Sequence, residues 1–228
     1  PQQLLGAAAV AAWLLLLAGL AVQVRQRWNG QREWSRKLVH IGTGMVVLIA
    51  WGCGIDRLVA IPAAGTITLL AALNHRLRIL PAVEDVGRAS YGTVAYGASI
   101  TTLLALDWPH QPAVVAAGVM VMAVGDGLAG LIGPLVKSPS WSVMGQRKSV
   151  VGTGAMAAVS LVALLVLWGL LVAGGWASGV PIPVPSPAAL VLIVAVGVAL
   201  EQVALLGLDN LTVPLAVGVL WYLLARPT

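Results

Sequence analysis

Residues 112–132 read PAVVAAGVMVMAVGDGLAGLI, and this stretch decides the fold. A helix needs about 20 apolar residues to cross the hydrocarbon core of a bilayer, and this run is long enough. Its only charged side chain is Asp126. A charge at the centre of a membrane helix costs about 2.5–3.5 kcal/mol on insertion scales, and less near the interface. The stretch therefore predicts a membrane helix whose single carboxylate has a functional task.

The composition of the whole chain agrees with a membrane protein. Of its 228 residues, 59% are hydrophobic and 9% are charged, whereas a soluble domain has about 25% charged residues. The mean hydropathy of +0.94 excludes a soluble enzyme core and a disordered chain. The single cysteine, Cys53, excludes an internal disulfide scaffold. We predict an all-α, polytopic membrane helical bundle in which residues 1–228 form one domain.

Eight apolar runs are candidate transmembrane helices, and the first of them is expected to be peripheral to the catalytic bundle. They are Leu4–Val24, Leu38–Cys53, Leu58–Leu73, Tyr91–Leu106, Pro112–Ile132, Gly152–Ala173, Ala188–Leu206 and Leu211–Ala225. Helix is the default because an open strand cannot satisfy its backbone in lipid.

The distribution of basic residues predicts which way these helices run. The net charge is +5, and the basic residues flank the apolar runs, which indicates a bilayer rather than nucleic acid as the partner. If the carboxyl end of the first run lies in the cytoplasm, 11 of the 13 Lys and Arg residues face the cytoplasm, and only Arg57 and Arg226 do not. Both termini then lie on the other side.

The first polar motif is RKLVHIGTG, residues 36–44, at the start of the second run. Arg36 and Lys37 lie four and three positions before His40, so all three occupy neighbouring faces of one helix. The two cations alone are typical membrane-interface anchors. An imidazole inside a membrane helix is costly without a partner, so His40 favours a functional cluster.

The second motif is GDGLAGLIG, residues 125–133. Asp126, Gly130 and Gly133 fall on one helical stripe, where a metal-bound phosphate could approach the backbone closely. The alternative is a small-residue surface for helix packing, which explains the glycines but leaves the aspartate unexplained.

The third motif is GQRKSVVGTG, residues 145–154. Arg147 and Lys148 supply positive charge, and Ser149, Gly152 and Thr153 resemble the glycine-permissive start of a helix that binds an anion. The spacing is not that of a Walker loop. Together with Asp126, the motif offers phosphate ligands and a magnesium ligand, as phosphoryl transfer requires.

Two lesser motifs complete the set of polar sequences. RASYGT, residues 88–93, opens the fourth run with Arg88 and Tyr91, and EQVALLGLDN, residues 201–210, closes the seventh. Glu201 has two equally supported roles, as partner of a basic residue or as a second ligand beside Asp126 on a metal. Asn210 is favoured as a cap of the last helix.

The motifs, in this order, resemble those of the polyprenol kinase family, which includes dolichol, phytol and farnesol kinases. The matching residues are Arg36, Lys37 and His40; Asp126, Ala129 and Gly133; and Lys148, Ser149, Gly152 and Thr153. The segments GLDNLTVPL, residues 207–215, and RASYGT look most like the phytol kinase branch. The sequence shows no counterpart of the extra N-terminal helices of dolichol kinases, so we expect an alcohol other than dolichol as the substrate.

The resemblance implies a magnesium-dependent kinase that uses CTP, or another nucleoside triphosphate, to phosphorylate an isoprenoid alcohol such as phytol at the cytoplasmic or stromal membrane face. Asp126, with Glu201 or Asp209, would bind the metal, and either His40 or Asp126 would accept the alcohol proton. The nucleotide would contact the cations and small residues of the three motifs, namely Arg36, Lys37, Gly130, Gly133, Arg147, Lys148, Ser149, Gly152 and Thr153. Arg88, Tyr91 and Asn210 are the expected substrate contacts.

Two other functions use the same features. A lipid cytidylyltransferase needs the same metal and triphosphate ligands, and a transporter could use Asp126 and Glu201 as intramembrane carboxylates. The clustering of charges at one face, away from the bilayer midplane, counts against the transporter. The sequence shows no internal repeat, which gives the transporter no further support.

Overall fold

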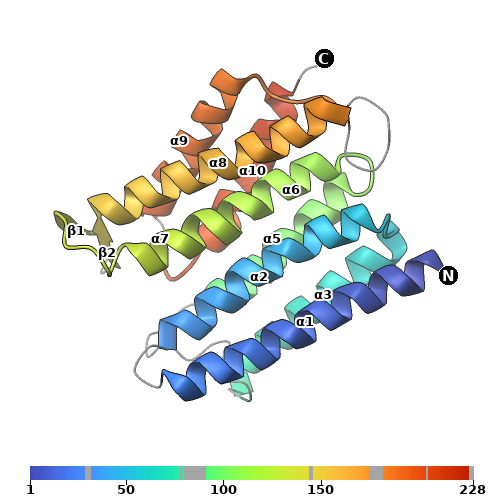
Figure 1. The fold of residues 1–228 in the computed structure, drawn as a ribbon, viewed down its shortest axis with the longest axis horizontal. Coiled ribbons are helices and arrows are strands. Elements are labelled where there is room, and N and C mark those ends of the chain that lie inside the picture. Colours follow the sequence, from blue (N-terminus) through green and yellow to red (C-terminus); the bar gives the residue numbers. More distant parts are fainter. Residues whose placement is uncertain are drawn as a thin grey trace.

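The fold is a bundle of long helices with one small β-hairpin, seen in a computed structural model that describes residues 1–28, 32–77, 79, 91–143, 146–174, 182–203 and 205–225 (Figure 1). The helical elements are α1 (Gln2–Arg27), α2 (Arg32–Gly52), α3 (Arg57–Leu77), α5 (Gly92–Asp107), α6 (Pro112–Met120), the π-helix η1 (Val121–Asp126), α7 (Gly127–Ile132), α8 (Val150–Gly174), α9 (Pro187–Val203) and α10 (Asp209–Leu224). The strands are β1 (Ser140–Val143) and β2 (Gln146–Ser149).

Long apolar runs form these helices because a helix satisfies its backbone hydrogen bonds within one segment. Among the described residues, four helices are long and apolar enough to cross a membrane, namely α1, α3, the continuous helix of residues 112–132, and α8. The helices α9 and α10 are apolar but shorter. The predicted all-helical class of membrane protein is therefore confirmed.

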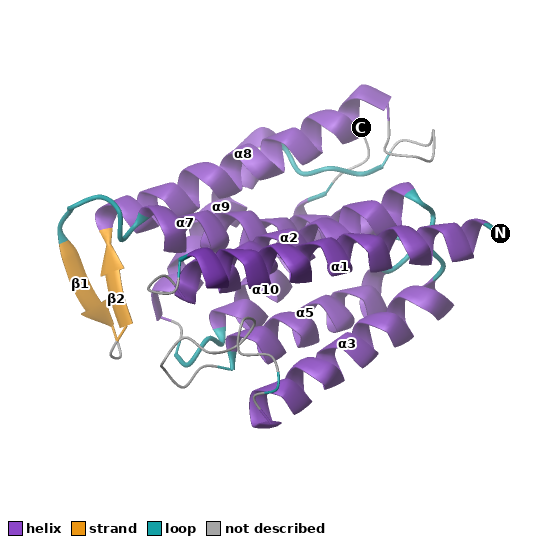
Figure 2. Cartoon of the chain, turned by 60° about the horizontal axis from the view of Figure 1, so that its bottom comes forward, coloured by secondary structure: helices purple, strands orange, loops and turns teal. Residues whose placement is uncertain are grey.

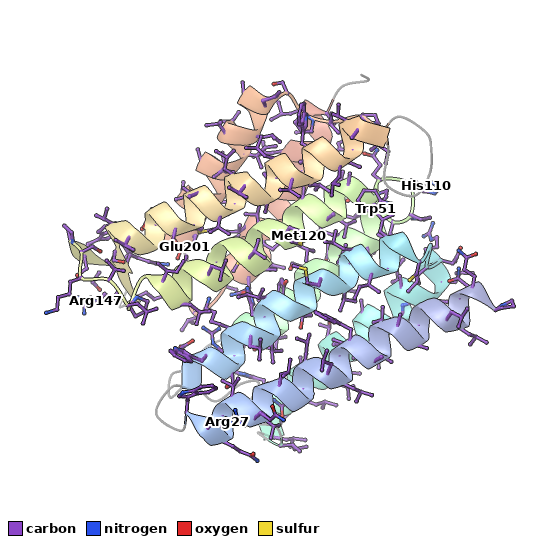
Figure 3. All side chains as sticks on the ribbon, in the orientation of Figure 1. Arg27, Trp51, His110, Met120, Arg147 and Glu201 are labelled. Carbon is purple, nitrogen blue, oxygen red and sulfur yellow. The ribbon has the colours of Figure 1, made fainter. Side chains whose placement is uncertain are left out.

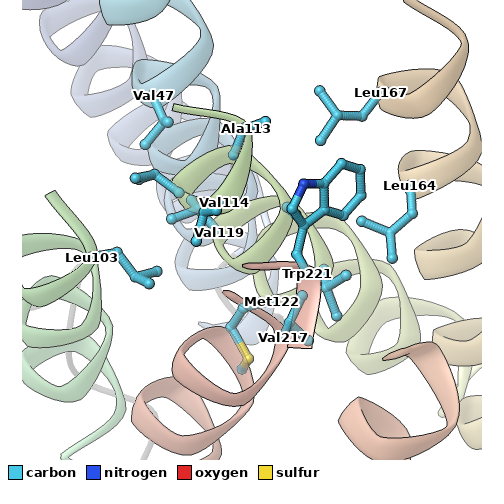
Figure 4. Packing of buried hydrophobic residues seen from close by; sticks show 14 of the residues in the cluster. Val47, Leu103, Ala113, Val114, Val119, Met122, Leu164, Leu167, Val217 and Trp221 are labelled. Atoms are coloured by element: carbon cyan, nitrogen blue, oxygen red, sulfur yellow. The ribbon is translucent and has the colours of Figure 1, made fainter. Parts of the chain in front are cut away.

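The helix of residues 112–132 lies at the centre of the core. Its first part, α6, is buried along almost its whole length, as expected for a helix that is apolar on every side. Around it pack buried side chains of α8 and α10, among them Leu164, Leu167 and Trp221 (Figure 4). This central position fixes where Asp126, at the end of η1, sits relative to all other helices.

The helices α1 and α3 lie at one edge of the bundle (Figure 1). The indole Nε1–H of Trp13 in α1 donates to the carbonyl of Gly42 in α2 at 2.8 Å. On α3, the hydroxyl groups of Thr68 and of Thr101 from α5 are 3.0 Å apart. Only 6% of the apolar window of α3 is buried, so most of its surface faces outward.

Successive helices alternate in direction, and this brings many polar segments to one end of the bundle. The starts of α2, α5, α8 and α10 lie there with the hairpin, while both ends of the described chain lie toward the opposite end (Figures 1 and 2). Arg27 and Arg147 are at the hairpin end, and Trp51 and His110 are at the other (Figure 3).

The structure corrects one expectation about the third motif. Arg147 and Lys148 lie on strand β2, not at a helix start. Ser149 ends that strand directly before α8, which begins at Val150 and contains Gly152 and Thr153 in its first turn, as expected. In the antiparallel hairpin, Trp141 pairs with Lys148 and Ser142 with Arg147. This segment is polar and sits outside the apolar core, so the hairpin does not break the rule that excludes open strands from lipid.

Candidate active site

A cavity of about 1110 Å³ lies at the hairpin end of the bundle. Its walls come from α2, η1, α7, the hairpin, α8, α9 and the start of α10, and they carry both basic and acidic side chains. Because the helices alternate in direction, segments that are distant in sequence meet around this one space. Ten residues of the second and third motifs and of the 201–210 segment were expected to bind nucleotide or metal, and all of them line the cavity: Asp126, Gly130, Gly133, Arg147, Lys148, Ser149, Gly152, Thr153, Glu201 and Asp209. Asn210, which was expected to contact the substrate, also lines it.

The first ion pair in the cavity joins α2 to η1. The Lys37 Nζ is 2.6 Å from Asp126 Oδ2 and also donates to the Asp126 backbone carbonyl at 3.1 Å. Both side chains are largely buried, with 6% and 14% of their surfaces exposed. A buried carboxylate is stable only with a partner, and Lys37 is that partner. Arg36 also lines the cavity, and its guanidinium bonds Glu33 at 2.7 and 3.0 Å.

The second ion pair joins the hairpin to α9. Lys148 Nζ donates to Glu201 Oε1 and, at 2.9 Å, to the Glu201 backbone carbonyl. The amide of Gln202 donates to Glu201 Oε2 at 2.7 Å and to Thr153 Oγ1 at 3.0 Å. Of the two roles considered for Glu201, pairing with a basic residue is therefore observed. Gln202, which lies inside the 201–210 motif but was not singled out from the sequence, thus connects two cavity residues, although a polar residue at the end of an apolar helix was a visible signal.

Three carboxylates approach one another between these two pairs. Each of the three residues Asp126, Glu201 and Asp209 has one carboxylate oxygen that lies within 4.8 Å of the corresponding oxygens of the other two. Three convergent carboxylates repel unless cations neutralise them, and Lys37 and Lys148 supply two positive charges at the same place. A divalent cation is the other charge that such a group could accept.

Asn210 adds a neutral oxygen beside this carboxylate group. Its amide nitrogen donates to the Gly207 carbonyl at 3.1 Å and faces Asp209 Oδ1 at 3.4 Å. These two contacts fix the orientation of the amide group, because rotating it by 180° would place Oδ1 against the oxygens of Gly207 and Asp209. The Oδ1 atom is buried without a hydrogen-bond partner. The expected cap is wrong: α10 begins at Asp209, and no side chain caps it.

The glycines of the second motif are covered by neighbouring elements. A Cβ on Gly130 would lie 2.4 Å from Lys37 Cε, and a Cβ on Gly133 would lie 3.2 Å from the Cα of Gly152. The two glycines therefore let α7 pack closely on α2 and α8. This is the role in helix packing that the sequence offered as the alternative to phosphate binding. Gly130, Gly133 and Gly152 nevertheless remain on the cavity wall.

The end of the hairpin forms the entrance to α8. Ser149 Oγ accepts the Gly152 backbone N–H at 3.1 Å, which is the bond of an N-cap side chain. Arg147 Nε donates to Ser140 Oγ at 3.2 Å, across the hairpin. Arg147 is exposed at the cavity rim, whereas Lys148 reaches inward.

The remaining expected site residues lie elsewhere. His40 is buried below the cavity and is not part of its wall. Tyr91 is 52% exposed, stacks on His75 at 4.8 Å between ring centroids, and donates its backbone N–H to Leu206. Tyr91 is not among the residues that line the cavity. Arg88 lies outside the described residues.

Comparison with known proteins gives one similarity that covers most of the chain. The chain is 39% identical to the phytol kinase of Synechocystis sp. over 184 aligned residues. The alignment covers 80% of this chain and 76% of the relative. No family model matches the chain. No solved structure matches it either.

Proposed function

The chain belongs to the phytol kinase family of isoprenoid alcohol kinases, and we propose that it transfers the γ-phosphoryl group of CTP to phytol at the cytoplasmic or stromal face of a membrane. Family membership makes it a kinase that phosphorylates an isoprenoid alcohol. The observation that carries the detailed proposal is the cavity where Lys37, Lys148 and three carboxylates converge at one end of an apolar bundle.

The triphosphate would lie along the basic wall of the cavity. Lys37 comes from α2 and Lys148 from the hairpin, and Arg36, Lys137 and Arg147 also line the space. Phosphoryl transfer depends mainly on positioning and on neutralising phosphate charge, which cations from several elements provide. Gly130, Gly133 and Gly152 also line the cavity, and their lack of side chains lets α7 lie close to α2 and α8 there. The preference for CTP rests on the family resemblance.

The residues around the three carboxylates fit a magnesium ion. Magnesium prefers oxygen ligands, usually one or two carboxylates with phosphates and water completing the shell. Asp126, Glu201 and Asp209 supply carboxylates, and the unpartnered Oδ1 of Asn210, a residue that lines the same cavity, would supply a neutral oxygen. Bound there, magnesium would neutralise charge that develops on the phosphates. Asn210, expected to contact the alcohol, is thus better suited to the metal.

The chain's own residues would then handle the proton of the alcohol. Of the two candidate acceptors, Asp126 lines the cavity and His40 does not. A carboxylate has two oxygens and several lone pairs, so Asp126 can contact Lys37 and still take a proton. The alcohol oxygen forms a bond to the γ-phosphorus as its proton passes to Asp126. The bond from that phosphorus to the β-phosphate oxygen breaks, and CDP leaves.

The alcohol would enter the cavity from the bilayer. Leu205 and Leu206 line the cavity and are 41% and 44% exposed, so they form an apolar rim beside polar walls. An isoprenoid tail can lie against such a rim in lipid while its hydroxyl group reaches Asp126. We propose that all eight helices cross the bilayer, with the basic hairpin end in the cytoplasm as the positive-inside rule requires.

Product analysis tests the proposal directly. Purified protein would be incubated with magnesium, CTP or ATP labelled at the γ-phosphate, and a panel of C15 to C20 isoprenoid alcohols. We expect labelled phytyl phosphate together with CDP. Release of pyrophosphate would instead identify a cytidylyltransferase, and nucleotide-independent counterflow in proteoliposomes would identify a transporter. Equal rates with CTP and ATP would remove the nucleotide preference and leave the kinase assignment intact.

A further inference from the structure

His40 makes contacts that do not suit a proton acceptor. It lies on α2 with 8% of its surface exposed. Its Nε2 is 3.0 Å from the Met122 backbone carbonyl and 3.5 Å from Asp126 Oδ2. A carbonyl oxygen can only accept, so Nε2 carries a hydrogen and donates it to Met122. That nitrogen has no lone pair with which to take a proton from an alcohol.

The partner of His40 lies in the π-helix that ends at Asp126. Met122 belongs to η1, residues Val121–Asp126, which interrupts the central helix between α6 and α7. A π turn holds one more residue than an α turn, and each residue of an α-helix advances about 100° around the axis. Without the extra residue, Asp126 would point about 100° away from its present direction. The π turn therefore determines that Asp126 faces the cavity.

Two residues of α2 hold this π turn near its two ends. His40 bonds the carbonyl of Met122 near the start, and Lys37 bonds both the carbonyl and the carboxylate of Asp126 at the end. Lys37 and His40 are three positions apart and thus share one face of α2. The next residue, Gly127, packs so closely on α2 that a Cβ there would lie 2.3 Å from Ile41 Cγ1.

The imidazole is itself held from the other side. Its ring stacks on Tyr96 of α5, with 4.3 Å between ring centroids and 30° between planes. The ring thus has a fixed orientation, with Nε2 directed at η1. A fixed donor beneath a bulged helix is suited to maintaining that bulge, since π turns persist only where their surroundings stabilise them.

We propose that His40 is a positioning residue: its hydrogen bond to the Met122 carbonyl maintains the π turn and so directs Asp126 into the cavity. The effect on catalysis rests on the function proposed above, in which Asp126 acts in the site. The effect on the π turn does not depend on that function.

Two substitutions separate positioning from proton transfer. His40→Gln keeps an N–H donor at similar reach but cannot titrate, and His40→Phe keeps the ring against Tyr96 but has no donor. We expect His40→Gln to retain activity within about tenfold of the wild type, with an unchanged pH profile, and His40→Phe to lose roughly a further ten- to hundredfold. Equal losses in both variants, with the acidic limb of the pH profile removed, would overturn the proposal.

Amide hydrogen exchange provides a readout that does not require activity. In detergent-solubilised protein, we expect residues 121–127 to exchange faster in His40→Phe than in His40→Gln or in the wild type. Equal exchange in all three proteins would also overturn the proposal. If the wild type phosphorylates no alcohol, the proposed function fails alone, and the exchange experiment still decides the role of His40.

The control is His110→Gln, a histidine change at the opposite end of the bundle (Figure 3), which should leave both readouts unchanged. If His40→Phe does not yield folded protein, His40→Met replaces it, because methionine also lacks a donor and adapts to the space available. His40→Gln distinguishes the two roles even if no donor-free variant folds. An amide cannot accept the alcohol proton, so activity retained in His40→Gln excludes His40 as the proton acceptor.

Discussion

At the scale of single residues, the site consists of charges that neutralise one another in pairs. Lys37 neutralises Asp126, and Lys148 neutralises Glu201, so each cation comes with a carboxylate from a distant part of the chain. A buried charge without a partner is strongly unfavourable, and this explains how an apolar bundle tolerates four ionised groups near its core. In the proposed function, the same four groups would bind a metal-bound triphosphate.

Replacing Asp126 tests the central carboxylate. Asp126→Asn keeps the shape of the side chain and removes its charge, so we expect the rate of phosphorylation to fall roughly a hundredfold or more. Steady-state kinetics per folded molecule, at several magnesium concentrations, measure this effect. Asp107→Asn, at the opposite end of α5, is the matched control and should behave as the wild type. A variant with near-normal turnover would leave Asp126 with only a packing role.

Replacing the two lysines tests whether they bind one ligand. Lys37→Met and Lys148→Met should each raise the nucleotide KM or lower kcat by roughly ten- to a hundredfold, because each removes one charge-assisted contact worth about 1.5–3 kcal/mol. The KM for the alcohol should change little. If both cations contact the same triphosphate, as proposed, the double variant should not show the simple sum of the two effects.

The control for the lysines is Arg57→Met, which removes an exposed cation from the other end of the bundle. It distinguishes ligand binding from membrane anchoring. If the lysines only anchor the helices, their replacement will reduce the yield of folded protein, and the protein that remains will have the nucleotide affinity of the wild type.

The sequence predicted which residue types gather in the site but not how they pair. Motif order and basic asymmetry placed Lys37, Asp126 and Lys148 at one membrane face. Whether Glu201 would contact Lys148 or a metal depends on how far each helix is rotated about its axis, and on a hairpin that has no apolar periodicity. The hydrogen bond that commits His40 to Met122 was likewise not visible, because its partner is a backbone atom.

At the scale of elements, apolar length predicted the helices well and predicted their interruptions poorly. The run at residues 112–132 was expected as one helix, and it is continuous, but it contains the π turn η1. Nothing in the apolar residues before Asp126 marks an extra residue per turn, since α6 and most of η1 are buried and carry no polar side chain that would distinguish one face from another. The hairpin of residues 140–149 was missed because short polar strands carry little signal.

A single methyl group at α7 tests how closely the helices must approach. In Gly130→Ala the new Cβ would meet the Cε and Nζ atoms of Lys37 at 2.4 and 2.8 Å. Lysine is flexible, so it should move away from Asp126 without unfolding the bundle. We expect weaker nucleotide binding with an unchanged or raised melting temperature, because alanine favours a helix over glycine by about 1 kcal/mol.

Gly169→Ala in α8 is the control for this change, because a Cβ there meets no atom within 4 Å. It should gain the same helix propensity and keep full nucleotide affinity. Nucleotide titration and thermal unfolding of both variants compare the two effects. Equal nucleotide affinity in the two alanine variants would show that Lys37 does not need its present position.

At the scale of the whole molecule, the alternating helix directions place the cavity at one end, which gives a test of topology. In a Cys53→Ala background, Ser142→Cys in the hairpin should react with a membrane-impermeant reagent from the cytoplasmic side. Ser186→Cys, just before α9, should react from the opposite side, because α8 separates the two positions. Labelling of both positions from the same side would mean that α8 does not cross the membrane.

The separation of the two ion pairs along the chain has a consequence for biogenesis. Lys37 lies 89 positions before Asp126, and Lys148 lies 53 before Glu201. At about 5–20 residues per second, a ribosome needs roughly 4–18 s to make the first separation. During that time α2 meets the translocon without the carboxylate that neutralises it. Ribosome-bound chains ending near residue 100 should therefore leave position 37 open to water-soluble reagents, and chains ending beyond residue 160 should protect it.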